Sequence, residues 1–363
     1  MKILMLTVNS RVVITFREKL IKHMQSLGHE VHVVCGDSKY KEEIEKRNIK
    51  FYEAVLDNRS QNLFASYKYK NTIAKLAKKI NPDIAMTFML KPNTFGVMGL
   101  KKAGVKNVYS MIEGMGDVFI NQGFKWTLIR KYVRYLYKKA FKYSKKVFVL
   151  NSKDKEYITN NNIVKEDKII QINGIGIDVY DFNYVKPYNV NNYLMIARLL
   201  KTKGVIEYCK AAEIIKKNYP QCTFTLVGPE GNITREDIKY YIENGYINYI
   251  GPVNNVKPYI EECSIYVLPS YREGMPVSTQ EAMAIGRGII TTNTAGCSDT
   301  VVEGLNGFIC EVADYEGLAS CIEKTIDNKD LVDKFGINSR KLVEEKFDIH
   351  IINKKVILII KVD

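Results

Sequence analysis

Residues 264–292 read SIYVLPSYREGMPVSTQEAMAIGRGIITT, and this stretch indicates how the second half of the chain folds. The apolar run at 264–268 predicts a strand, and the next residues predict a turn because they include Pro269, Gly274 and Pro276. A helix is expected from about 278 to 285, and the apolar run at 288–292 predicts another strand. Strand, turn, helix and strand in this order are typical of a parallel sheet covered by helices.

The same alternation runs through the whole chain, which has 363 residues and is too long for one typical core. In the first half, strands are expected at 2–8, 31–35, 51–55, 84–88, 107–111 and 146–150. In the second half, further strands are expected at 193–197, 222–227 and 247–250. The weakly patterned stretch 173–192 predicts the boundary between two α/β domains, 1–185 and 186–346. The C-terminal segment from about 347 to 363 is expected to pack back on the first domain.

Charge is distributed unevenly between the halves. Residues 1–188 hold 34 Lys and Arg against 17 Asp and Glu, a net +17, and residues 189–363 hold 20 against 23, a net −3; these sum to the overall +14. Such asymmetry indicates that one domain faces an anionic partner, for which nucleic acid, acidic lipid and a diphosphate substrate all qualify. A nucleic-acid protein is disfavoured because the second half is not basic and contains no recognised nucleic-acid motif.

The N-terminal residues MKILMLTV are expected to form a first strand, since they lack the longer apolar region of a signal peptide. No run of about 18 apolar residues predicts a membrane-spanning helix. The seven cysteines are scattered without a CxxC pair, which favours reduced thiols in a cytoplasmic protein. With four histidines and no Asp-x-Asp motif, no metal site is predicted.

Two glutamates flank the turn in the opening stretch. Glu273 lies in the loop, where its carboxylate can accept hydrogen bonds from a sugar, and Glu281 lies on the first helical turn, where it can accept them from a ribose. Ser278 is expected to cap this helix, with Glu281 three residues later as in a capping box. The helix start should direct N–H groups toward an anion. The alternative is that Glu281 only caps the helix and Glu273 is a solvated loop charge.

Arg198 and Lys203 follow the strand expected at 193–197, where two cations can neutralise a diphosphate. Turns at 227–229 and 251–253, which contain Gly228 and Val253, can let a nucleoside approach the backbone closely. Each of these features also has an ordinary interpretation, as surface cations or as simple turns between a strand and a helix.

Taken together, these residues resemble family 4 of the retaining glycosyltransferases, which have the GT-B fold of two facing Rossmann-like domains with a cleft between them. The matching segments are ARLLKTKG at 197–204, TLVGPEGN at 225–232, YIGPVNNV at 249–256 and the stretch from 264 to 309. The resemblance implies that domain 186–346 binds a nucleotide-sugar donor and domain 1–185 binds the acceptor. It also implies that no metal is needed and that the sugar keeps its configuration.

By this resemblance, Arg198 and Lys203 bind the donor diphosphate, Glu273 contacts the transferred sugar and Glu281 contacts the ribose. The phosphates and the sugar are expected to meet the turn formed by Met275, Pro276, Val277 and Ser278. Many family members carry Gly-Gly in the first turn between strand and helix. This chain has Thr7-Val8-Asn9-Ser10 there, so Asn9 or Ser10 is expected to take over any phosphate contact from that turn.

The segments KPNTFGVMGLKKAGV at 91–105 and IEGMGDVFINQGFK at 112–125 resemble the N-acetylhexosaminyltransferases of capsule and O-antigen assembly, which extend lipid-linked sugars. The expected donor is a UDP-sugar, with N-acetylgalactosamine the first candidate, and the expected acceptor is a polyprenyl diphosphate carrying a sugar. Acceptor binding is assigned to Arg17, Lys91 and Asn93. Glu113 and Asp117 are candidates to orient the acceptor hydroxyl.

Residues 125–146 hold nine Lys and Arg and no acidic residue, and their apolar side chains repeat at helical spacing. A basic amphipathic helix with aromatic residues suits an anionic membrane surface, so peripheral association with the inner face of the cell membrane is expected. The alternative is that the apolar stripe packs on the core. Two other functions stay open: a non-enzymatic sensor of sugar nucleotides, and a GT-B transferase with a soluble acceptor. A GT-B epimerase is disfavoured by the four histidines.

Overall fold

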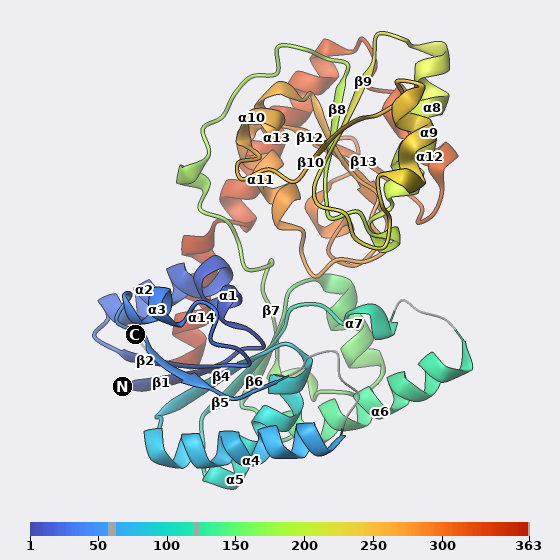
Figure 1. Ribbon diagram of the computed structural model, residues 1–363. Coiled ribbons are helices and arrows are strands. Elements are labelled where there is room, and N and C mark those ends of the chain that lie inside the picture. The colour runs from blue at the N-terminus through green and yellow to red at the C-terminus, as the bar shows by residue number, and fades with distance from the viewer. Residues whose placement is uncertain (57–62, 120–122, 362–363) are drawn as a thin grey trace. The chain divides into compact units, whose positions relative to one another are not determined.

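The computed structural model describes residues 1–56, 63–119 and 123–361, except for the side chains of Leu63 and Asp117. The chain divides into two compact units (Figure 1). Unit 1 contains Met1–Ile175 and His350–Asp363, and unit 2 contains Gly176–Ile349. The division therefore falls earlier than the expected boundary at 185/186, since the backbone N–H of Val185 donates to Ile285 O of unit 2 at 2.9 Å.

Unit 1 is built on a parallel sheet with strand order β3-β2-β1-β4-β5-β6-β7. Its strands are β1 (Lys2–Leu6), β2 (Glu30–Cys35), β3 (Lys50–Glu53), β4 (Ile84–Phe88), β5 (Val108–Ile112), β6 (Lys146–Val149) and β7 (Ile169–Gln171). In the centre of the sheet, Leu4 pairs with His32 on one side and with Ala85 on the other. Central strands are apolar throughout because helices cover both of their faces.

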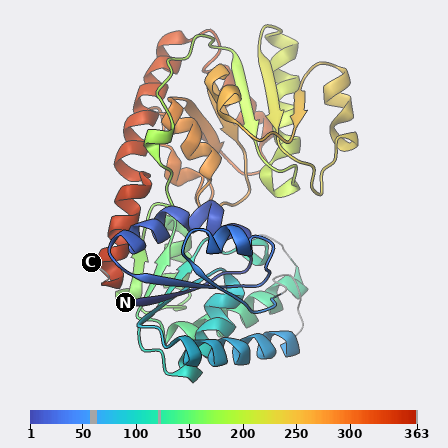
Figure 2. The ribbon, with the colours of Figure 1, turned by 60° about the vertical axis from the view of Figure 1, so that its left-hand side comes forward.

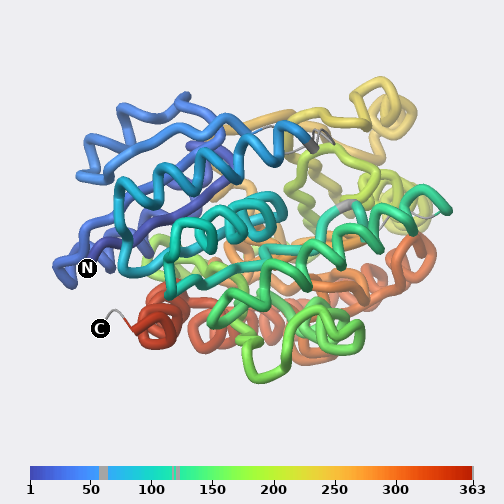
Figure 3. Tube along the Cα trace, turned by 90° about the horizontal axis from the view of Figure 1, so that it is seen from below, coloured from blue at the N-terminus to red at the C-terminus, as the bar shows by residue number. Residues whose placement is uncertain are grey.

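The α-helices of unit 1 are α1 (Ser10–Val12), α2 (Glu18–Ser26), α3 (Lys41–Glu45), α4 (Leu63–Ile80), α5 (Val97–Ala103), α6 (Phe124–Phe141), α7 (Ser152–Asn160) and α14 (Ile349–Ile360). Short turns are η1 (Val13–Arg17), η2 (Pro92–Gly96), η3 (Asp117–Phe119) and η4 (Glu166–Lys168), of which η1 and η2 are π-helical. Helices α4, α5 and α6 lie along one face of the sheet (Figures 1 and 3). Helix α14 returns to this unit, with Lys355 Nζ donating to Gln171 O at 2.9 Å.

The core of unit 1 lies between the sheet and these helices. Leu100, Leu136 and Ala140 pack against the apolar faces of β1, β4 and β5. Beside them, Tyr137 and Phe141 of α6 stack with their ring centroids 4.9 Å apart. Burying each large apolar side chain contributes about 1.5–3 kcal/mol, so this half of α6 is firmly attached.

Unit 2 repeats the architecture with strand order β10-β9-β8-β11-β12-β13, again parallel (Figure 2). Its strands are β8 (Asn192–Ile196), β9 (Thr223–Val227), β10 (Asn248–Gly251), β11 (Ile265–Leu268), β12 (Gly288–Thr292) and β13 (Gly307–Cys310). Its α-helices are α8 (Val205–Asn218), α9 (Lys239–Glu243), α10 (Lys257–Glu262), α11 (Val277–Ile285), α12 (Tyr315–Glu323) and α13 (Lys329–Lys346). Short 3-10 turns are η5 (Val179–Asp181), η6 (Lys201–Lys203), η7 (Glu236–Ile238) and η8 (Ser298–Thr300).

The α/β class and the two parallel sheets predicted from the sequence are confirmed. The sequence did not predict two strands, β7 and β13. They have only three and four residues, and such short runs give little periodicity. All seven cysteines are free and buried. In the part of the chain that the structure describes, no helix combines the length and the apolar character needed to cross a bilayer.

Candidate active site

The candidate donor residues of unit 2 gather where the strand order reverses. Strand β8 lies between β9 and β11, so the chain turns toward opposite edges of the sheet on either side of the β8–β11 pair. Open α/β sheets bind ligands at such a point, beyond the carboxyl ends of the strands. Arg198 and Lys203 follow β8, and Glu273 follows β11. The topology therefore brings both predicted segments to one edge.

Glu273 is held by two side chains. Its Oε1 lies 2.5 Å from Lys203 Nζ and accepts a hydrogen bond from Ser270 Oγ at 2.6 Å. The Glu273 side chain is 12% exposed and that of Lys203 is 27% exposed, so the pair is shielded yet reachable. The backbone N–H of Glu273 also donates to Ala295 O at 3.0 Å. The carboxylate thus has a fixed position beside a cation.

The helix after this loop begins differently from the sequence prediction. Helix α11 starts at Val277, with Pro276 in the N-cap position and no side chain capping it. The expectation that Ser278 caps the helix, with Glu281 completing a capping box, is therefore wrong. Ser278 Oγ instead lies 2.7 Å from Tyr266 OH, and the same phenolic oxygen lies 3.1 Å from Ile196 O. Ser278 serves to tie the helix to the sheet, and the uncapped N–H groups remain at the helix start.

Glu281 lies further along α11, half-buried. Burial raises the pKa of its carboxyl to about 7, and the charge of Lys257 opposes that rise. Removing a carboxylate from water disfavours its charged form. A ligand that donates hydrogen bonds to Glu281 would therefore favour the ionised carboxyl again.

Arg198 is exposed, whereas Met275 and Pro276 are buried and Val277 is half-buried. Among the described residues, no hydrogen bond or ion pair involves the Arg198 side chain, so its guanidinium is available for an anion.

The turn that carries Lys203 continues into Gly204. At Gly204, φ is +74° and the Pro269 carbonyl lies close, so only glycine fits without strain.

The turns after β9 and β10 are also neighbours. The N–H of Gly228 donates to Gly251 O at 2.9 Å, and Val253 follows in the second turn, half-buried. At Gly228, φ is +146° and an added Cβ would collide with the Ala197 carbonyl after β8. The predicted Gly228 turn therefore packs directly on the backbone that leads to Arg198.

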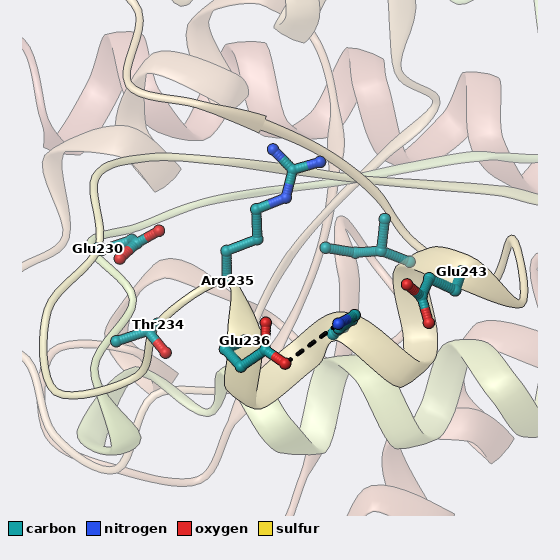
Figure 4. A pocket seen from close by; sticks show the side chains of 7 residues that line it. Glu230, Thr234, Arg235, Glu236 and Glu243 are labelled. Carbon is teal, nitrogen blue, oxygen red and sulfur yellow. Dashed lines mark hydrogen bonds and ion pairs between the residues drawn. The ribbon is translucent and has the colours of Figure 1, made fainter.

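A separate hollow lies beside η7 and α9 (Figure 4). Its wall is formed by Glu230, Thr234, Arg235, Glu236, Lys239, Ile242 and Glu243. Lys239 and Glu236, three residues apart on one wall, form an ion pair at 3.2 Å. None of the predicted donor residues lines this hollow, so we do not assign the donor to it.

In unit 1, two predicted residues meet at the carboxyl edge of the sheet. Arg17, the last residue of the π-helical turn η1, forms an ion pair with Glu113, which follows β5. The Arg17 guanidinium also lies over the Phe88 ring, 4.4 Å from its centroid. Burial lowers the pKa of Arg17 to about 9. Since the Arg17 side chain is only 3% exposed and that of Glu113 is 21% exposed, the carboxylate is the more accessible partner.

The other acceptor candidates of unit 1 have different surroundings. Asn93 is fully buried in η2, where its Oδ1 accepts from Thr87 Oγ1 at 2.7 Å and its Nδ2 donates to Met111 O at 2.8 Å. These bonds explain Asn93 as a link between β4 and β5, and no acceptor contact is needed to account for it. Lys91 precedes η2 and is mostly buried. Asp117 begins η3, and its side chain lies outside the described residues.

The first turn of unit 1 is engaged within the fold. Asn9 caps α1 by accepting from the Val12 N–H at 3.1 Å, and Ser10 Oγ donates to Asp37. Both side chains are therefore already hydrogen-bonded within the protein, which disfavours the expectation that Asn9 or Ser10 takes over a phosphate contact.

Two residues that position the site were missed from the sequence. Ser270 holds Glu273, and Phe88 supports Arg17. A serine directly after a strand and a proline is a weak signal for Ser270. Phe88 gave no signal beyond belonging to an apolar strand.

The two parallel α/β units and the solved structures of the same architecture define a GT-B fold, and two family models identify the class of protein, a glycosyltransferase. The family model described as Glycosyl transferases group 1 matches residues 177–342, and the model described as Glycosyltransferase Family 4 matches residues 15–178. The chain belongs to family 4 of the glycosyltransferases, as its sequence motifs indicated.

Curated relatives cover nearly the whole chain. The chain is 29% identical over 330 residues to the N,N'-diacetylbacillosaminyl-diphospho-undecaprenol alpha-1,3-N-acetylgalactosaminyltransferase of Campylobacter jejuni, covering 87% of each chain. It is 23% identical over 338 residues to the UDP-Gal:alpha-D-GlcNAc-diphosphoundecaprenol alpha-1,3-galactosyltransferase of Escherichia coli, covering 88% of this chain and 86% of that one.

Solved structures agree on the fold. A glycosyltransferase from Rickettsia africae superimposes with a TM-score of 0.80 at 23% identity, covering 99% of this chain and 97% of that one. HepE of Anabaena, solved with UDP and glucose, gives a TM-score of 0.78 at 15% identity, covering 99% of each. At these identities the likeness establishes the fold alone.

Proposed function

We propose that the protein is a retaining, metal-independent transferase that moves a hexose or N-acetylhexosamine from a UDP-sugar to a polyprenyl-diphosphate-linked saccharide. N-acetylgalactosamine is our first candidate for the sugar. Support comes from the Campylobacter and Escherichia relatives, whose acceptors are undecaprenyl-linked sugars, and from HepE, which binds UDP within the same fold.

The observation that carries this proposal is the cluster of Lys203, Glu273 and Ser270 at the switch point of unit 2. Lys203 and Arg198 neutralise the donor diphosphate, assisted by the uncapped N–H groups at the start of α11. The diphosphate draws Lys203 from Glu273, and the freed carboxylate accepts hydrogen bonds from the sugar hydroxyls. Glu281 accepts from the ribose. Charge on the leaving phosphate is stabilised by these fixed cations and dipoles, so no metal ion is required.

On the acceptor side, we assign Glu113 to orient the attacking hydroxyl. Arg17 is too buried to reach an acceptor diphosphate, and we assign it to hold Glu113 in place. The bond between the anomeric carbon and the phosphate oxygen breaks, and the bond to the acceptor oxygen forms on the same face of the sugar. The acceptor proton passes to the leaving phosphate. Lys91 remains the candidate for the acceptor diphosphate.

We place the reaction in the cytoplasm, at the inner face of the cell membrane. A polyprenyl tail keeps its acceptor in the bilayer, so the enzyme must reach the headgroup region. The basic helix predicted at 125–146 corresponds to α6, in unit 1.

A donor screen tests the proposal. Purified protein is incubated with a series of UDP-sugars and a short-chain polyprenyl-diphosphate sugar in EDTA, and the product's anomeric configuration is determined by NMR. Transfer with retention in EDTA is expected. Dependence on added Mg²⁺ or Mn²⁺ would refute metal independence, an inverted product would refute retention, and no transfer from any UDP-sugar would overturn the donor assignment.

A further inference from the structure

Helix α6 presents two different stripes of apolar side chains. One stripe, formed by Val133, Leu136, Tyr137, Ala140 and Phe141, is buried in the core of unit 1. The other stripe contains Phe124, Leu128, Tyr132 and Tyr135, all of which are exposed. The exposed positions are spaced by three or four residues, which places them on one helical face. The core therefore accounts for only part of the apolar character of this helix.

Helix α4 adds exposed aromatic side chains beside that stripe. Phe64 is 89% exposed, compared with 80% for Phe124, and Tyr67 is exposed as well. Both α4 and α6 contact η2. Burial raises the pKa of Tyr132, and the charges of Tyr67 and Tyr135 add to the rise, so Tyr67 of α4 lies within electrostatic range of Tyr132 of α6. Tyr67 also packs edge-on against Phe95 of η2, with centroids 5.9 Å apart. Figure 3 shows α4 and α6 on the same side of unit 1.

Lysines surround these rings, and neither helix contains an Asp or Glu. Lys70 Nζ lies 5.3 Å from the Tyr67 ring centroid, and Lys139 Nζ lies 5.9 Å from that of Tyr135. Exposed lysines of the two helices include Lys68, Lys125, Lys131 and Lys138. Apolar and aromatic side chains projecting among uniformly cationic ones match the interface of an anionic bilayer, where the rings enter the headgroup region and the lysines meet lipid phosphates.

We propose that this aromatic–lysine face of α4 and α6 docks the protein on an anionic lipid bilayer. The inference deepens the proposed function, because it names the lipid chemistry and the side chains that bring the enzyme to a membrane-bound acceptor. It differs from the sequence expectation in two ways. The proposed membrane face includes α4. Several apolar residues of α6 that the sequence periodicity assigned to the membrane helix belong instead to the core.

Vesicle co-sedimentation of the full chain tests the proposal directly. The probes are vesicles of phosphatidylglycerol mixed with phosphatidylethanolamine, and vesicles of phosphatidylcholine alone. One variant carries Phe64→Ser, Phe124→Ser and Leu128→Ser, and another carries Lys125→Gln, Lys131→Gln and Lys138→Gln. Matched controls in unit 2 are Tyr188→Ser for an exposed ring and the triple Lys329→Gln, Lys341→Gln, Lys346→Gln for exposed lysines.

Wild type and both controls are expected to bind the anionic vesicles and to bind phosphatidylcholine at least about tenfold more weakly. The lysine variant should lose at least about tenfold in partitioning, since one lysine near the surface contributes about fivefold. The apolar variant should lose at least about tenfold as well, since inserting one large apolar side chain contributes about tenfold or more. Equal binding of wild type to both vesicle types would overturn the proposal. So would wild-type binding by the apolar variant, which would indicate attraction through charge alone, as for a nucleic acid or an acidic protein.

Activity separates this inference from the proposed reaction. With a short-chain, water-soluble acceptor, the apolar variant should keep the wild-type turnover, and with the acceptor embedded in anionic vesicles it should lose at least about tenfold. Equal loss with both acceptors would overturn the docking role. If wild type transfers no sugar to either acceptor, the proposed function is wrong. Vesicle binding then still tests whether the aromatic–lysine face of α4 and α6 binds lipid.

Discussion

Lys203 Nζ lies 2.5 Å from Glu273 Oε1, so a cation after β8 and a carboxylate after β11 meet at the switch point of the second sheet. The two residues are 70 positions apart in the chain. Their pairing gives the proposed donor site opposite charges side by side, one suited to a diphosphate and the other to sugar hydroxyls.

Removing either member of this pair should abolish most of the transfer activity. Lys203→Ala and Glu273→Gln are each expected to lower kcat by roughly a hundredfold or more, the loss typical of removing one group that stabilises a transition state. The double variant should lose less activity than the two single losses combined, because both residues act in one contact. Lys201→Ala, in the same turn, is the control. Full activity in both folded single variants would refute the donor-site assignment.

Donor affinity should depend on pH through Glu281. Burial raises the pKa of its carboxyl to about 7. Because only the ionised carboxyl accepts hydrogen bonds from both ribose hydroxyls, UDP affinity should fall as pH decreases from 8 to 6, by about tenfold at most. Calorimetric titration with UDP measures this. Glu281→Gln should bind weakly with no such dependence. A wild-type profile as flat as that of Glu281→Gln would contradict this role.

The same raised pKa affects stability with the opposite trend. The folded protein holds the Glu281 proton to a higher pH than the unfolded chain, so the free energy of unfolding falls as pH rises from about 4.5 to 7. Glu281→Gln should therefore be more stable than wild type at pH 8, by on the order of 2 kcal/mol, and nearly equal at pH 4.5. Urea unfolding at the two values measures the difference. The control is Glu262→Gln, at an exposed residue. A gain in stability of Glu281→Gln that did not depend on pH would contradict the raised pKa of Glu281.

The Arg17–Glu113 pair should behave as a coupled unit. Glu113→Gln leaves a buried guanidinium without its counter-charge, which is expected to cost about 3 kcal/mol of unfolding free energy. Arg17→Met should also destabilise, and the double variant should lose less than the sum of the two. Denaturant unfolding measures all three, with the exposed Glu53→Gln as control. Additive losses would mean that the two residues do not interact.

Two glycines with similar backbone conformations provide a matched comparison. Gly204 and Gly245 have φ values of +74° and +70°, but an added Cβ meets the Pro269 carbonyl only at Gly204. Gly245→Ala should cost about 1 kcal/mol through its positive φ alone. Gly204→Ala should cost at least about 1 kcal/mol more and weaken UDP binding, because Pro269 begins the loop that carries Glu273. Equal Tm values for the two variants would contradict the packing described for Gly204.

Regular patterns in the sequence were sufficient to predict the two-sheet α/β architecture. Apolar runs predicted the parallel strands, and the resemblance to family 4 assigned Lys203 and Glu273 to one donor site. Family motifs added the roles. Local chemistry was less reliable even there, since Ser278 is a natural helix cap and yet bonds to Tyr266, because α11 begins one residue earlier.

By itself, then, the sequence determined the α/β class through its periodicity, and the resemblance of its motifs indicated the family and the candidate residues after β8 and β11. Only the tertiary structure decided that Arg17 is buried against Glu113, that Ser270 holds Glu273, and which stripe of α6 faces solvent. These relations join segments far apart in the chain. Their geometry depends on which side chains the packed core leaves room for, and no local pattern carries that information.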